Sequence, residues 1–254
     1  MRKSEKRTQK HYNENPEGYY FERTDIYRLD NLTSYEFWIV AIYLKKMLTD
    51  YVRRHDQIVL DVGSGTGAYT LFFKKLGFHT VIGSDFSSGM LKLSKSKGIP
   101  YLVQCDAELL PFRSRSVDII ASFALLEHVT RPNRVLLELC RLSSKEGKIL
   151  LMTPNPLYYK LFRVRRLQES QFERFIPRDE LEFHLYKKAK ILDFSTGYIL
   201  PPFIAIILKF IGTISRTLLS RCLLGYILLE TRILQKTSLV NRMGYLQLIL
   251  YQTM

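Results

Sequence analysis

Three glycines alternate with other residues at the end of a short apolar run, in the stretch VLDVGSGTGAYT of residues 59–70. Glycine tolerates a positive φ and has no Cβ, so a ligand can lie directly against the backbone at Gly63, Gly65 and Gly67. The spacing also fits the loose dinucleotide fingerprint, with Asp85 at about the distance expected of an acid that binds a ribose. These residues predict a site for a nucleotide-containing cofactor, and taken alone they leave an NAD enzyme open.

The acid just before this turn argues for a positively charged ligand. A pyrophosphate favours a helix N-terminus with free amides and little negative charge nearby, which a carboxylate at Asp61 would oppose. A sulfonium or an ammonium group would be stabilised by the same carboxylate. The alternatives are structural: Asp61 tied to amides of the loop, Asp85 as a helix cap, and Asp106 as a turn or cap residue.

The elements that must position these residues alternate along the chain. Short apolar strands are expected at 58–63, 79–85, 101–106, 117–123, 147–155 and 191–199, and a last one at 244–252; helices are expected at 34–52, 68–77, 88–98, 133–143 and 177–189. This order predicts an α/β fold with a Rossmann-like seven-stranded, mostly parallel sheet sandwiched by helices, an antiparallel last strand, and a helical apolar insert before it. Such sheets bind ligands beyond the carboxyl ends of their strands, where the glycines lie.

The motifs together resemble those of class I S-adenosylmethionine-dependent methyltransferases. D-x-G-x-G-x-G, from Asp61 to Gly67, resembles the first motif of that family, and VIGSDFSSGML and QCDAELLPFRSRSVDII are similar to its second and third. FALLEHV resembles the segment after the fourth strand in the branch that methylates quinones and many small molecules. One departure is Lys145-Glu146-Gly147, where the family usually has a proline-glycine turn; we expect it to affect only the turn.

The resemblance implies S-adenosylmethionine as the cofactor. It implies that Asp85 holds the ribose hydroxyls and that Asp106 contacts the adenine amine. The full set of cofactor residues that it implies is Asp61, Gly63, Ser64, Gly65, Gly67, Asp85, Phe86, Asp106, Ala107 and Phe123. The acceptor is expected to be a small or lipid-like molecule.

Methyl transfer from a sulfonium needs alignment of the reactants and no metal. An oxygen or carbon nucleophile also calls for a base, for which His128 is the candidate, with Glu127 orienting it or contacting the cofactor. The alternative for His128 is a hydrogen bond to the backbone at a helix start.

Four tyrosines are candidates for the lid and the acceptor side. HYNENPEGYY resembles an N-terminal segment that folds over the cofactor in related enzymes, which makes Tyr12 and Tyr20 candidate lid residues; Tyr158 and Tyr159 could line the acceptor side. Packing under the first helix and a solvated face are the alternatives.

The chain is expected to divide into an N-terminal helical lid segment (1–54), a cofactor-binding core (55–200), an amphipathic helical insert (201–244) and a final strand of the core sheet (245–254). In the insert, Lys209, Thr213, Arg216 and Ser220 form a polar stripe on a largely apolar helix. Between 203 and 244, six Lys and Arg residues stand against Glu230 alone. This pattern suits an interfacial helix on an anionic membrane, with a cap over the core or a homodimer interface as the alternatives.

The composition of the chain limits which partners and which cellular location are expected. The 254 residues carry a net charge of +14, which suits nucleic acid, an anionic membrane or acidic substrates. No RNA-binding appendix is visible, so a nucleic-acid partner is the less favoured interpretation, beside an NAD-linked oxidoreductase. The cysteines are far apart, and no apolar segment follows the basic N-terminus, so we expect a cytoplasmic protein that is peripheral on a membrane through the insert.

Overall fold

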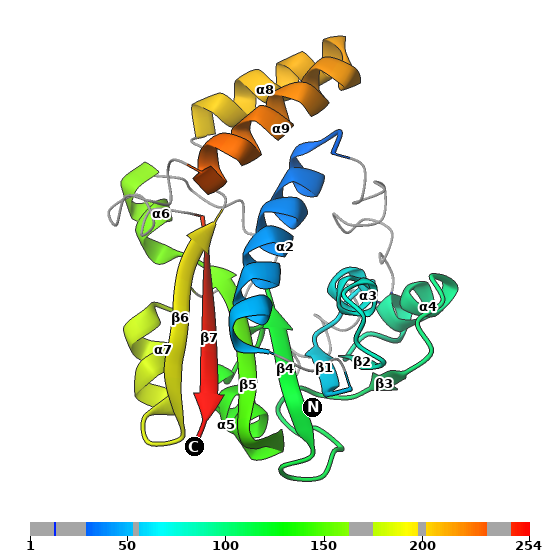
Figure 1. Cartoon of the computed structure of the whole chain (residues 1–254), viewed down its shortest axis with the longest axis vertical. Helices are drawn as coiled ribbons and strands as arrows, with labels where there is room; N and C mark the ends of the chain where they lie inside the picture. Colours follow the sequence, from blue (N-terminus) through cyan, green and yellow to red (C-terminus); the bar gives the residue numbers. More distant parts are fainter. Residues whose placement is uncertain (1–12, 14–28, 53–55, 163–174, 198–201, 233–244) are drawn as a thin grey trace.

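The computed structural model describes residues 13, 29–52, 56–162, 175–197, 202–232 and 245–254. Its centre is a seven-stranded sheet with the order β3-β2-β1-β4-β5-β7-β6 (Figure 1). The strands are β1 Ile58–Val62, β2 Thr80–Asp85, β3 Leu102–Gln104, β4 Val117–Phe123, β5 Ser143–Pro154, β6 Ala189–Gly197 and β7 Leu246–Thr253.

The sheet confirms the predicted topology. Neighbouring strands from β3 through β5 run parallel, whereas β7 runs antiparallel to both β5 and β6, between which it lies. The chain order reverses at β1, because β2 lies on one side of it and β4 on the other. A crevice beyond the carboxyl ends of the strands is expected at such a switch point.

Alternating residues of each strand send their side chains to two separate cores. On one face, Val59 and Ile119 pack beneath α2 (Leu32–Tyr51) and α3 (Ala68–Lys75). On the other, Leu60 and Ile120 pack with α5 (Pro132–Leu142) and α7 (Arg178–Leu185). Both faces are therefore covered, as the continuous apolar strands require.

Two short helices were not predicted, and one strand is longer than expected. The 3-10 helix η2 (Leu126–His128) follows β4, and α6 (Pro156–Phe162) follows β5. Strand β5 begins at Ser143, but its register with β4 slips between Val117 and Ile119. The departure Lys145-Glu146-Gly147 lies in this irregularity, with Glu146 at φ 62°, so the change is absorbed locally.

The insert forms a helical hairpin of α8 (Pro202–Ile214) and α9 (Arg216–Arg232), which lie side by side beyond one end of α2 (Figure 1). Gly212 permits their close approach, because a Cβ there would lie 2.9 Å from Leu219 Cδ2. Within the described ranges, no helix is both long enough and apolar enough to cross a membrane.

A buried polar contact fastens this hairpin to α2. The hydroxyl of Tyr35 donates a 2.6 Å hydrogen bond to the Glu230 carboxylate, and both residues are fully buried. Burial, with Glu230 nearby, raises the pKa of Tyr43 well above its usual range, so this tyrosine stays neutral. The contact fixes the register of α9 on α2 because a buried carboxylate needs hydrogen-bond donors.

Replacing Tyr35 with Phe should lower the free energy of unfolding by about 1–3 kcal/mol, because Glu230 would lose a donor while staying buried. Urea denaturation would measure the change. The matched control is Tyr51→Phe, at a 37% exposed tyrosine whose hydroxyl donates to the Leu192 carbonyl. The control should change stability by less than about 0.5 kcal/mol. Equal effects of the two substitutions would contradict the fastening role of Tyr35.

Candidate functional site

The glycine loop after β1 depends on its glycines for backbone conformation and for packing. Gly63, Gly65 and Gly67 all have positive φ, of 74°, 53° and 79°. A Cβ at Gly67 would lie 2.1 Å from Ile99 Cδ1, and one at Gly63 would lie 2.9 Å from Leu125 Cδ1. At Gly65, however, no atom lies within 4 Å of the Cβ position. Gly63 and Gly67 pack against the protein, and Gly65 leaves open space.

Asp85 ties this loop to the next element. Its carboxylate accepts hydrogen bonds of 2.8 Å from the amides of Gly65 and Ser87. Burial raises the pKa of Asp85, and the amide hydrogen bonds oppose that rise. Ser87 is the N-cap of α4 (Ser88–Ser96), where it accepts from the Met90 amide. The cap role considered for Asp85 thus belongs to Ser87, and Asp85 bridges the loop and the helix start.

Asp61 lies behind the loop and is not among the residues that line the cavity described below. It is 2% exposed and accepts a 2.6 Å hydrogen bond from the Thr70 hydroxyl on α3. Burial raises its pKa to about 7, while the bond from Thr70 acts in the opposite direction. Asp61 is therefore held by a side chain of the following helix, and its proton is easily gained or lost near neutral pH.

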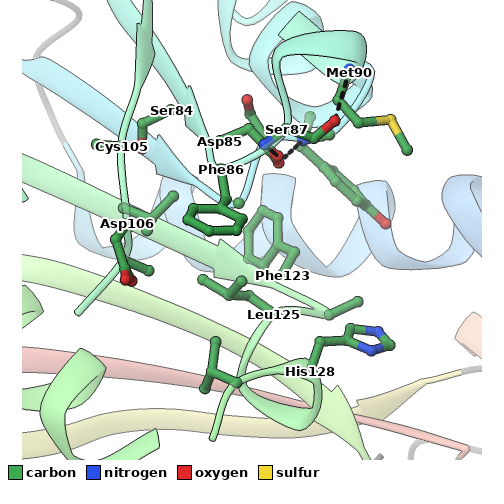
Figure 2. Close-up of a pocket in the computed structure, with 18 of the residues that line it drawn as sticks. Ser84, Asp85, Phe86, Ser87, Met90, Cys105, Asp106, Phe123, Leu125 and His128 are labelled. Atoms are coloured by element: carbon green, nitrogen blue, oxygen red, sulfur yellow. Dashed lines mark hydrogen bonds between the residues drawn. The ribbon is translucent and has the colours of Figure 1, made fainter. Parts of the chain in front are cut away.

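A cavity of about 280 Å³ lies at the carboxyl ends of β1, β2 and β4 (Figure 2). It brings together most of the residues that the sequence nominated: Gly63, Ser64, Gly65, Asp85, Phe86, Asp106, Ala107, Phe123 and His128. Gly67 is not in its lining, consistent with its packing on Ile99. In Figure 2 the rings of Phe86 and Phe123 lie between Asp106 and His128.

The charge of the lining is negative. Its carboxylates are Glu36, Asp85, Asp106 and Glu108, and among the described lining residues there is no Lys or Arg. Glu108 forms an ion pair with Arg131. The cavity therefore favours a ligand that carries positive charge, and it lacks the cations that a pyrophosphate would use. In the described part of the chain, no cluster of His, Cys, Asp and Glu could hold a metal ion.

His128 ends the 3-10 helix after β4, and its side chain lines the cavity (Figure 2). Its backbone amide donates to the Leu125 carbonyl at 2.9 Å, which fixes this turn. Glu127 is 1% exposed and is not among the lining residues, so its side chain is buried outside the cavity. The two neighbouring residues are thus placed in different environments.

The tyrosine predictions have different outcomes. Tyr12 and Tyr20 lie outside the described residues. Tyr158 is buried, with its ring edge-on to Tyr245 at 5.4 Å, and it is not part of the cavity lining. Tyr159 belongs to α6. Of the four, only Tyr158 has a described side chain, and that side chain lies outside the cavity lining.

Sequence reasoning missed Glu36 and Tyr69, which enter the lining from α2 and α3. The Tyr69 ring packs edge-on against Phe123 at 4.7 Å. Burial raises its pKa well above the usual range, and the nearby carboxylates of Glu36 and Asp61 add to the rise. The sequence signal that could have identified Glu36 is an acid between two aromatic residues, Tyr35 and Phe37, on an otherwise apolar helix.

Asn13 was also missed. Its side-chain oxygen accepts a 2.8 Å hydrogen bond from the Ser87 hydroxyl at the start of α4. Asn13 belongs to the HYNENPEGYY stretch, so one residue of the expected lid reaches an element that borders the cavity.

Comparison with known proteins agrees with this geometry. Residues 60–151 match the family model described as a methyltransferase domain. The chain is 27% identical, over 139 residues, to the malonyl-[acyl-carrier protein] O-methyltransferase of Buchnera aphidicola subsp. Baizongia pistaciae, covering 53% of this chain and 56% of that protein. It is 35% identical over 97 residues to the demethylmenaquinone methyltransferase of Renibacterium salmoninarum, covering 37% and 40%. The chain thus spans about half the length, or less, of these curated relatives.

Solved structures share the fold. The PH0226 protein of Pyrococcus horikoshii superposes with a TM-score of 0.60 at 15% identity, covering 96% of this chain and 99% of that one. The YcgJ protein of a Bacillus species superposes with a TM-score of 0.56 at 18% identity, covering 83% and 97%. The matched region of the sequence, the order of the strands and the position of the cavity at the switch point of the sheet are all consistent with one another. Over residues 60–151 the chain is therefore similar to methyltransferase domains, in agreement with the resemblance of its motifs to the class I S-adenosylmethionine-dependent type.

Proposed function

We propose that this protein transfers a methyl group from S-adenosylmethionine to a small-molecule or lipid-like acceptor. The observation that carries the proposal is the cavity that joins the open Gly65 loop to four carboxylates, with no Lys or Arg among its described lining residues. A sulfonium and an ammonium suit such a lining. Calorimetry with S-adenosylmethionine and, separately, with NAD tests it: binding of NAD alone would overturn the proposal.

The residues present fit this cofactor. Asp85 has both carboxylate oxygens at the mouth of the glycine loop, where they can accept from ribose hydroxyls. In Figure 2, Asp106 lies on the other side of the Phe86 ring from Asp85, and this separation supports its proposed contact with the adenine. When bound, the cofactor supplies an electrophilic methyl group. The chain's own part is to hold it, to exclude water and to align the acceptor.

On the acceptor side, His128 is proposed as the general base. Its side chain borders the same cavity as Phe123 and Met152, which together offer an apolar wall and a titratable group. Neutral imidazole is available near pH 7 and can take a proton from an oxygen or carbon acid. Glu127, the buried neighbour of His128 in sequence, is proposed as a positioning residue. Tyr12, Tyr20, Tyr158 and Tyr159 stay proposals for the lid and the acceptor side.

The acceptor class is inferred from the apolar wall and from relatives whose names specify quinone methylation and malonyl-[acyl-carrier protein] methylation. We also propose that the protein works in the cytoplasm, peripherally at an anionic membrane, with a homodimer as the alternative use of the insert. The division into lid, core, insert and final strand belongs to the same proposal. An RNA substrate is less favoured, because the cavity has no described cation to hold a phosphate.

Replacing Asp85 with Ala should weaken S-adenosylmethionine binding by ~1.5–3 kcal/mol, because a charge-assisted hydrogen bond is lost. Calorimetry would measure it. Asp85 also holds Gly65, so a control must loosen the same loop without touching the ligand. Ser94→Ala does so, since the Ser94 hydroxyl donates to the Gly65 carbonyl at 2.8 Å and lies outside the lining. If Ser94→Ala weakened binding as much as Asp85→Ala, the ribose role would be wrong.

Binding of the cationic cofactor should release a proton from Asp61. Its pKa of about 7 in the free protein means that the carboxyl is mostly neutral at pH 6. A nearby positive charge favours the ionised form, so affinity should rise by about tenfold from pH 6 to pH 8. Calorimetry in buffers of different ionisation enthalpy would detect the proton.

Asp61→Asn is the control for this linkage, since it cannot titrate and still offers an oxygen to Thr70. The variant should show only the pH dependence that belongs to the ligand itself. Identical pH profiles for the wild type and the Asn variant would show that Asp61 does not sense the ligand.

Replacing His128 with Asn should lower turnover by ~10²-fold or more and leave cofactor affinity nearly unchanged. The pH–rate profile should also lose its acidic limb. His184→Asn provides a matched control, because His184 lies on α7 and is not part of the cavity lining. Unchanged turnover of His128→Asn on an identified acceptor would leave His128 a structural role only.

A further inference from the structure

One surface of the helical hairpin is apolar and uncovered. Its side chains are exposed by 40–69%, although large apolar side chains usually gain from burial. They are Ile206, Ile207, Phe210 and Ile214 on α8, and Leu218, Leu224, Leu228 and Leu229 on α9. The opposite side of the hairpin is different: Leu208, Leu219, Leu223 and Ile227 are buried in the core shared with α2. The hairpin thus has one face for the protein and one face without a described partner.

The exposed side of the hairpin is also positively charged. Lys209, Arg216, Arg221 and Arg232 are exposed, and the only acid among residues 202–232 is the fully buried Glu230. Arg216 is 82% exposed and lies 4.0 Å from Asp30, outside the hairpin. On α9, Arg221 and Arg232 share the outward side with Leu224 and Leu228. Cations with long apolar stems beside exposed leucines are typical of helices that lie in a membrane interface.

We infer that the α8–α9 hairpin is a docking surface for an anionic lipid bilayer. Its apolar side chains would enter the region between the headgroups and the acyl chains, and its cations would meet the lipid phosphates. Each Lys or Arg near such a surface contributes a favourable term, so the partner is specified by charge as well as by hydrophobicity.

Two other partners fit this surface less well. A second copy of the chain related by a two-fold axis would bring the same cations face to face, with no described acid of the hairpin surface to compensate them. A nucleic acid would satisfy the cations. It offers no apolar region for Ile206, Phe210 and Ile214, which are 66–69% exposed.

The position of the hairpin gives the docking a direction. In Figure 1 the arrow of β4 points toward the end of the molecule that carries α8 and α9, whereas β7 points away from it. The carboxyl ends of the parallel strands, where the cavity lies, therefore face the same side as the hairpin. This orientation rests on the proposed function: a lipid-like acceptor in the bilayer would be on the side of the methyl-transfer site.

The test is sedimentation of the full chain with vesicles of phosphatidylglycerol and, in parallel, of phosphatidylcholine. The wild type should sediment with the anionic vesicles at low salt, much less so at high salt, and weakly with the neutral ones. The triple variant Ile207→Ser, Phe210→Ser, Ile214→Ser should lower the partition coefficient by at least about 100-fold, since these three side chains supply the inserted apolar area. Phe183→Ser, at a 77% exposed site on α7, is the control and should bind like the wild type.

A second pair of variants separates the local patch from the overall charge. Lys209→Gln with Arg221→Gln should lower the partition coefficient roughly 30-fold. Lys92→Gln with Lys95→Gln removes the same charge from exposed positions of α4 and should change it less than about twofold. Equal effects of the two pairs would overturn the docking surface.

Other results would overturn it as well. These are a wild type that stays in the supernatant at low salt, equal binding to neutral vesicles, or a lipid-free dimer that the triple variant dissociates. Binding of RNA, abolished by the triple variant, would assign the surface to nucleic acid instead. Calorimetry with S-adenosylmethionine, without vesicles, shows that each variant is folded. It also separates a failure of docking from a failure of the proposed function.

Discussion

The carboxylate of Asp85 is the constraint on which the rest of the site depends. It accepts one hydrogen bond from an amide of the glycine loop after β1 and one from an amide of the segment that begins α4. Two separate βα connections therefore share one negative charge. The loop is held from other directions too: the amides of Gly63 and Ser64 donate to the Ser84 carbonyl, and the Ser94 hydroxyl donates to the Gly65 carbonyl. Because so many contacts fix its backbone, the loop can leave open space at Gly65 without collapsing into it.

A buried negative charge of this kind needs compensation. Burial raises the pKa values of both Asp61 and Asp85, and two further carboxylates, Glu36 and Asp106, border the same cavity. Such an arrangement destabilises the free protein, and the binding of a cation offsets this cost. The site is therefore electrostatically prepared for its ligand, which is how functional sites commonly differ from the rest of a fold.

Much of the sheet was predictable from sequence because its signals are local. Continuous apolar runs gave the strands, and glycines such as Gly77 and Gly98, both at positive φ, marked helix ends. Asp85 and Asp106 could be placed at the carboxyl edge of the sheet because each is the last residue of a predicted strand. Asp61 was harder to place, because whether a carboxylate faces the ligand or lies behind a loop depends on packing against α3.

The residues that sequence reasoning missed come from elements distant in the chain. Glu36 reaches the cavity only because α2 packs on the same face of the sheet as α3, and no local pattern records that contact. The bond between Tyr35 and Glu230 joins residues 195 positions apart. The hydrogen bond from Ser87, at the start of α4, to Asn13 is a third case. Contacts of such long sequence separation follow from the assembled fold, not from the periodicity of a segment.

The place where the hairpin leaves the sheet has a consequence for how the fold could have acquired it. Strand β6 ends at Gly197, which is paired with Leu246 at the start of β7, so the chain departs and returns at adjacent points. A tight turn between these two antiparallel strands would preserve every register pair of the sheet. Because the ends of the loop are already adjacent, lengthening the loop costs little entropy. The forty-eight intervening positions, 198–245, are thus topologically an extended β-hairpin tip. A domain without them would keep the loops that border the cavity unchanged, so the length and composition of this segment can vary without altering the edge of the sheet that carries the cavity.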